Sequence, residues 1–193
     1  MRALRGGGAR DTSGCELTDR LLGHAAGLAV SAFVIVADRL TKVAAVAWLD
    51  PLHPREVIPG FFDLTLVRNP GGVFGFMRDL SEGIRSVVFT LVPALVIAGI
   101  AWYAWRLPPE QRLTRTALSL VLGGATGNLI DRIMLGHVID FLDVYWRDHH
   151  WPAFNVADSA ICIGVALMLF EGLFVRSPGA SDPLPPRSEG DAS

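Results

Sequence analysis

The chain has 193 residues, of which 51% are hydrophobic and 19% are charged, and its formal net charge is -2. Charged residues make up about 25% of an ordinary soluble domain, so their shortage, together with a mean hydropathy of +0.39, indicates that lipid solvates part of the chain. The small negative charge and the lack of a basic stripe with interleaved aromatic residues argue against a nucleic-acid partner.

Four apolar stretches approach the length of about 20 residues that crosses a bilayer. The predicted spans cover residues 21–42, 84–105, 114–135 and 155–175. The third contains LGGATGN, whose small residues allow close helix packing. The first could instead be a cleaved signal peptide, but the three later spans favour a membrane anchor. The sequence therefore predicts an all-α integral membrane protein built as a four-transmembrane-helix bundle.

Polar tails at residues 1–20 and 176–193 flank the predicted membrane domain at residues 21–175. Both are rich in Gly, Ser, Pro and charge, which predicts disorder. An even number of spans places both tails on one side of the membrane. Arginines are dense in the short loop between the second and third spans and in the N-terminal tail, so the positive-inside rule predicts cytoplasmic tails.

The first outer loop is the only extended polar segment between spans. In FFDLTLV, polar and apolar residues alternate with the period of a strand, and NPGG signals a turn before VFGFM. We expect a small extracytoplasmic β-hairpin or cradle on the membrane surface.

Ionisable residues inside predicted spans are candidates for function, because hydrocarbon penalises an unpaired charge. Asp38 and Lys42 are spaced i, i+4 and can neutralise each other, which favours a structural ion pair. Asp158 follows Asn155 by three residues, the spacing of a capping box at the start of the fourth helix.

A second carboxylate, Asp140, lies just beyond the third predicted helix, where the antiparallel helix pair can return it to the depth of Asp158. Two close carboxylates share a proton, so one can activate water while the other donates to a carbonyl. Asp131 and Asp143 are further candidates for the partner. No metal-binding or GxSxG spacing competes with this chemistry, and no metal or cofactor is expected.

The blocks DRLTK, NPGGVFGF, GGATGNLIDR, GHVIDF and FNVADS, in this order, strongly resemble the lipoprotein signal peptidase (signal peptidase II) family over roughly residues 20–175. The resemblance implies an aspartic endopeptidase of the bacterial inner membrane that cleaves diacylglyceryl-modified prolipoproteins before the lipidated cysteine. It implies a monomer among membrane lipids, with the site near the outer face.

The resemblance also assigns residues to roles. It places the catalytic pair on Asp140 and Asp158 and a structural polar pair on Asp38 and Lys42. The residues that it implies line the site are Asn69, Gly71, Asn128, Arg132 and Asn155. If Asp158 lies in the first turn of the fourth helix, the helix dipole favours its ionised form, so Asp140 would hold the shared proton more often.

Two other classes of function compete with a peptidase. A small proton- or ion-coupled transporter also uses intramembrane carboxylates, but here the acidic residues gather at one membrane face and no inverted repeat is evident. A scaffold without catalysis would leave the Asp and Asn motifs unexplained.

Overall fold

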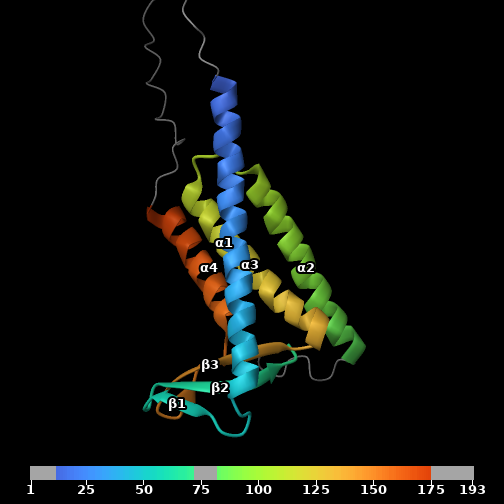
Figure 1. Ribbon diagram of the computed structural model, residues 1–193, viewed down its shortest axis with the longest axis vertical. Coiled ribbons are helices and arrows are strands. Elements are labelled where there is room, and N and C mark those ends of the chain that lie inside the picture. The colour runs from blue at the N-terminus through green and yellow to red at the C-terminus, as the bar shows by residue number, and fades with distance from the viewer. Residues whose placement is uncertain (1–11, 72–81, 175–193) are drawn as a thin grey trace, which may run out of the picture.

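The computed structural model describes residues 12–71 and 82–174, and its four helices stand over a small sheet (Figure 1). The helices are α1 (Thr12–Trp48), α2 (Glu82–Arg106), α3 (Arg112–Leu135) and α4 (Val156–Phe174). The strands are β1 (Arg55–Ile58), β2 (Phe62–Asn69), β3 (Val138–Trp146) and β4 (His149–His150). All the described strands lie at one end of the bundle.

Each of the four helices has a stretch long and apolar enough to cross a membrane, and each of these stretches overlaps one of the four predicted spans. Their outer surfaces carry large apolar side chains such as Leu28, which is 68% exposed, and Phe33, which is 74% exposed. Such surfaces suit lipid rather than water. Helix α1 begins before its predicted span, so residues 12–20 are helical and do not belong to a disordered tail. Residues 1–11 and 176–193 of the predicted tails lie outside the described part.

Helix α3 packs against the other three helices, and glycines make this possible. A Cβ atom at Gly123 would lie 2.9 Å from the backbone oxygen of Ser31 on α1. A Cβ at Gly124 would collide with the backbone oxygen of Ala157 on α4. The small-residue stretch therefore lets three backbones approach closely, as its composition predicted.

Replacing Gly124 by alanine should force α3 and α4 apart, because the collision involves backbone and not a flexible side chain. We expect Gly124→Ala to destabilise the protein by about 1–3 kcal/mol. Gly99 is the control, since no described atom outside its own helix backbone and chain neighbours lies within 4 Å of its Cβ position. Gly99→Ala should stabilise α2 by about 0.5–1 kcal/mol. Thermal unfolding of both variants in detergent measures the contrast, and equal shifts would contradict it.

The sheet is antiparallel with the strand order β1-β2-β3-β4. Strand β2 confirms the strand predicted from FFDLTLV, while VFGFM lies outside the described residues. Strand β3, which connects α3 to the short β4, was not predicted. It pairs with β2 so that Val67 lies opposite Asp140 and Asn69 lies opposite Val138. The pairing brings the segment between α1 and α2 beside the predicted catalytic residue Asp140.

Candidate active site

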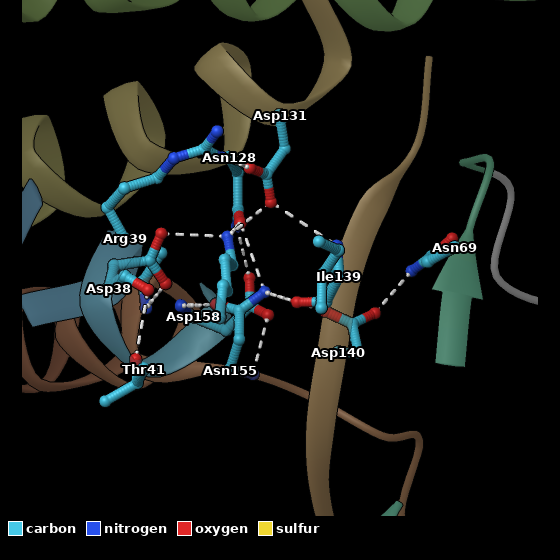
Figure 2. Close-up of polar contacts among 12 residues, drawn as sticks. Asp38, Arg39, Thr41, Asn69, Asn128, Asp131, Ile139, Asp140, Asn155 and Asp158 are labelled. Carbon is cyan, nitrogen blue, oxygen red and sulfur yellow. Dashed lines mark hydrogen bonds and ion pairs between the residues drawn. The ribbon is translucent and has the colours of Figure 1, made fainter. Parts of the chain in front are cut away.

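Asp140 lies on β3, beyond the end of α3 as predicted, and is only 2% exposed. Both carboxylate oxygens accept hydrogen bonds from amide side chains (Figure 2). Oδ1 accepts from Asn155 Nδ2 at 2.7 Å, and Oδ2 accepts from Asn69 Nδ2 at 3.0 Å. A strand and two amides from different elements therefore fix the position of this carboxylate.

The turn after β2 determines which way the Asn69 amide points. Gly71 N donates to Asn69 Oδ1 at 3.0 Å, which leaves Nδ2 of Asn69 to face Asp140. Gly71 has a φ of +88°, and a Cβ there would lie 2.8 Å from the ring of Phe89. Glycine is favoured at this turn for both reasons. Gly71 thus acts on the site through Asn69.

Asp158 lies in the first turn of α4 and forms the predicted capping box with Asn155. Asp158 N donates to Asn155 Oδ1 at 2.9 Å, and Asn155 N donates to Asp158 Oδ2 at 3.3 Å. The remaining oxygen of Asp158, Oδ1, accepts from Asn128 Nδ2 of α3 at 2.7 Å. The predicted capping box is therefore confirmed. The same carboxylate also accepts a hydrogen bond from α3.

Two asparagines connect the carboxylates of Asp140 and Asp158 (Figure 2). Asn155 Nδ2 donates to Asp140 and also to Asn128 Oδ1, the latter at 3.1 Å. Lys42 Nζ donates to the same Asn128 oxygen at 2.9 Å. An ammonium group can only donate, so Lys42 requires the oxygen of Asn128 on its side and turns Nδ2 toward Asp158. The structure brings Asn69, Asn128 and Asn155 together around the two aspartates.

Lys42 is also the centre of a buried ion cluster between α1 and α3. It pairs with Asp38 and with Asp131, both at 2.8 Å, and all three side chains are at most 2% exposed. Asp38 Oδ1 accepts from Ala157 N at 3.0 Å and so reaches α4. The predicted contact between Asp38 and Lys42 forms, and it is part of a larger network.

Asp131, the competing candidate for the catalytic partner, belongs to this ion cluster. Arg39 Nη1 donates to Asp131 Oδ1 at 2.8 Å. Ile139 N donates to Asp131 Oδ2 at 3.3 Å, which holds β3 next to Asp140. Sequence reasoning missed Arg39, because an arginine near the end of a span resembles an interfacial anchor. Asp143, the third candidate, pairs with His150 at 2.9 Å.

A cavity of about 820 Å³ gives access to both aspartates. Its lining includes Asn69, Arg132, Asp140 and Asp158, together with apolar groups of the 151–154 segment and one face of α4. Arg132 Nε is buried without a hydrogen-bond partner in the described part of the chain. The guanidinium carbon lies 6.0 Å from the centre of the Phe89 ring. A cation whose Nε has no partner among the described residues therefore borders the same cavity as the two carboxylates.

Burial is the main reason why the pKa of Asp140 is raised above its ordinary value, and the charge of Asp158 acts in the same direction. Hydrogen bonds from Asn69 and Asn155 oppose this effect, because they stabilise the ionised form. The net result is a carboxyl group that keeps its proton at a pH where an exposed aspartate would have lost it.

The raised pKa has a measurable consequence for stability. The folded state binds the Asp140 proton more tightly than the unfolded chain does, so the group stabilises the fold below its ordinary pKa, and this contribution is lost as the pH rises through the raised value. Over that interval, we expect the unfolding temperature of the wild-type protein to fall more steeply with pH than that of Asp140→Asn. Identical slopes would mean that Asp140 is already ionised in the folded protein.

A family model and individual known proteins both match this chain, and they describe the same kind of protein. A family model for signal peptidase (SPase) II matches residues 30–174. A lipoprotein signal peptidase of Syntrophotalea carbinolica is 47% identical over 142 residues, which are 74% of this chain and 87% of that protein. One from Geobacter sulfurreducens is 49% identical over 134 residues, covering 69% and 82%.

A solved structure of a bacterial membrane enzyme superimposes with a TM-score of 0.69 at 28% identity, over 79% of this chain and 95% of that one. With its four apolar helices and a family match over most of its length, the chain belongs to the signal peptidase II family of membrane peptidases.

Proposed function

We propose that this protein removes the signal peptide from diacylglyceryl-modified bacterial prolipoproteins, cleaving before the lipidated cysteine as an aspartic endopeptidase. One observation carries the proposal: Asp140 and Asp158 come from different elements, line one cavity and are linked through the side chains of Asn128 and Asn155. The similarity to lipoprotein signal peptidases supports the substrate class.

The charges around the site support a shared proton. Four carboxylates and three cations lie in or beside the network, namely Asp38, Asp131, Asp140, Asp158, Arg39, Lys42 and Arg132. Fully ionised, this set carries one net negative charge in surroundings that solvate charge poorly. One proton bound to the pair of Asp140 and Asp158 makes the whole set of seven residues neutral. The raised pKa of Asp140 and the position of Asp158 at the positive end of α4 favour Asp140 as its holder.

The reaction follows from this protonation state. Asp158 accepts a proton from a water molecule as that water attacks the scissile carbonyl carbon, while Asp140 donates its proton to the carbonyl oxygen. The tetrahedral intermediate collapses when Asp158 returns a proton to the departing amine. Asp140 then recovers its proton from the new carboxyl group, so no covalent enzyme intermediate forms and the pair is reset.

Residues around the pair position the substrate. Arg132, whose Nε is without a partner among the described residues, can donate to a backbone carbonyl of the substrate. Asn69 holds Asp140, and the apolar side of the cavity, including Phe154 and Ile163, suits the acyl chains of a lipidated substrate. We place both termini in the cytoplasm and the site near the outer face of the inner membrane, from the distribution of arginines.

The decisive test compares two precursor peptides that differ only in a diacylglyceryl group on the cysteine. We expect the purified protein to cleave the lipidated peptide on the N-terminal side of that cysteine and to leave the unmodified peptide intact. Mass spectrometry of the products locates the cut. Cleavage of both peptides at similar rates would overturn the proposed substrate class. The alternative of an ion-coupled transporter is not favoured, since the relatives are peptidases.

A further inference from the structure

A second polar cavity is lined in part by the connection between α2 and α3. This connection lies at the end of the bundle opposite the sheet (Figure 1). It has a volume of about 460 Å³ and is lined by α1, the connection and the first turns of α3. Its charged lining residues are Asp19, Glu110, Arg112 and Arg115. None of them contributes to the candidate active site, so peptide cleavage does not account for this cavity.

Arg115 is the buried cation of this second cavity, with 6% of its surface exposed. Its Nη2 donates to the carbonyl oxygens of Leu107 and Pro108, both at 3.1 Å. A guanidinium has five N–H donors, and Nε has no partner among the described residues. No ion pair within the described part of the chain includes Arg115. A buried positive charge therefore faces the cavity without a protein counter-ion from that part.

Helix α1 is shaped to admit this guanidinium. A Cβ atom at Gly23 would collide with the Arg115 guanidinium. A Cβ at Gly27 would lie 2.8 Å from Ser119 Oγ and 3.6 Å from Arg115 Cγ. Two glycines one helical turn apart thus leave room for the arginine, so the cation is held at the cavity wall by two helices.

The polar cavity adjoins an apolar groove of about 140 Å³, and the two share Gly27 and Arg115. The groove runs between α1, α2 and α3, along membrane-spanning segments, and Leu28, Ala101 and Leu122 line it. A polar cavity that continues into an apolar groove fits a molecule with a polar head and a hydrocarbon chain.

The signs of the charges specify the polar head further. The first turn of α3 has no side-chain cap at Gln111, so its backbone N–H groups and positive dipole end add to Arg112 and Arg115. An anion suits that side. Asp19 and Glu110 on the same cavity suit a cation. A phosphate joined to a primary amine matches both sides.

We propose that this cavity binds one membrane glycerophospholipid with a phosphate and a primary amine in its headgroup. The phosphate lies at Arg112 and Arg115, the amine lies at Asp19 and Glu110, and the first methylene groups of one acyl chain enter the groove. The site is separate from the peptidase site and is independent of the proposed reaction.

Native mass spectrometry of the full-length protein tests this proposal with phosphatidylethanolamine and phosphatidylglycerol of identical acyl chains. We expect one retained phosphatidylethanolamine, bound about tenfold more tightly than phosphatidylglycerol, a difference that a single well-placed charge contact can supply. The double variant Asp19→Asn with Glu110→Gln should lose this preference. Arg112→Gln should weaken the binding of both lipids.

The groove is tested with a matched pair of variants on α2. Ala101→Phe fills the groove and should weaken both lipids, whereas Val96→Phe places the same ring at an exposed position outside the groove lining and should change neither. All variants should cleave the lipidated precursor like the wild-type protein, which establishes that they fold. The proposal is wrong if no single lipid is retained or if the double acidic variant keeps the headgroup preference. It is also wrong if Ala101→Phe binds both lipids as the wild type does.

Discussion

Asp140→Asn and Asp158→Asn should each abolish cleavage of a lipidated precursor while leaving the protein folded. Each variant removes one of the two groups that move protons in the proposed reaction, and such groups contribute about 10²–10⁴-fold each. Both side chains line the large cavity, and an asparagine has the same shape as an aspartate, so each substitution preserves the shape of the site. Initial rates of product formation, measured by mass spectrometry, give the effect.

The matched control for these variants is Asp143→Asn. Asp143 lies on the same strand as Asp140, but it pairs with His150 at the exposed end of the sheet. It does not appear in the lining of the large cavity. Its amide variant should retain nearly full activity. Substantial turnover by Asp140→Asn or Asp158→Asn, or inactivity of Asp143→Asn, would refute the assignment.

Lys42→Met should be the most destabilising single change in the ion cluster. Lys42 is fully buried and contacts Asp38, Asp131 and Asn128. Its removal takes one ion pair away from each of the two buried carboxylates. Breaking a buried pair in this way costs about 3–5 kcal/mol. It also releases the Asn128 amide, so activity should fall along with stability. The unfolding temperature in detergent and the rate of precursor cleavage measure the two effects.

Arg39→Met provides the comparison for Lys42→Met. Arg39 also pairs with Asp131, but its side chain is 37% exposed and Lys42 remains as a partner for that carboxylate. Exposed or partly exposed pairs contribute about 0–1 kcal/mol. We therefore expect a small loss of stability and nearly full activity. If the two variants were equally destabilised, Lys42 would not be the centre of the cluster.

Local sequence patterns were sufficient to predict the helices, the β2 strand and the capping box. Apolar length defines a span without knowledge of its neighbours, and the Asn155 to Asp158 box depends only on residues three apart. The proximity of Asp140 to Asp158 followed from the antiparallel arrangement of two helices. These features depend on short-range chemistry and on the topology of membrane crossing.

The rest of the site depends on contacts between residues distant in the chain. Asp131 and Arg132 are adjacent in sequence, yet one joins the ion cluster with α1 and the other borders the cavity. The salt bridge from Arg39 spans 92 positions, which no local pattern encodes. Strand β3 had a usable signal, since VIDFLDVYW is rich in β-branched and aromatic residues. Its location between two spans favoured a loop instead.

The most direct test of the aspartate pair is the single-turnover rate of cleavage in Asp140→Asn, in Asp158→Asn and in the double variant. Groups that act together on one water molecule are non-additive, because losing either disables both. The account predicts that the double variant is no slower than the slower single variant. Losses that multiply in the double variant would show that Asp140 and Asp158 act independently, and would contradict a shared catalytic pair.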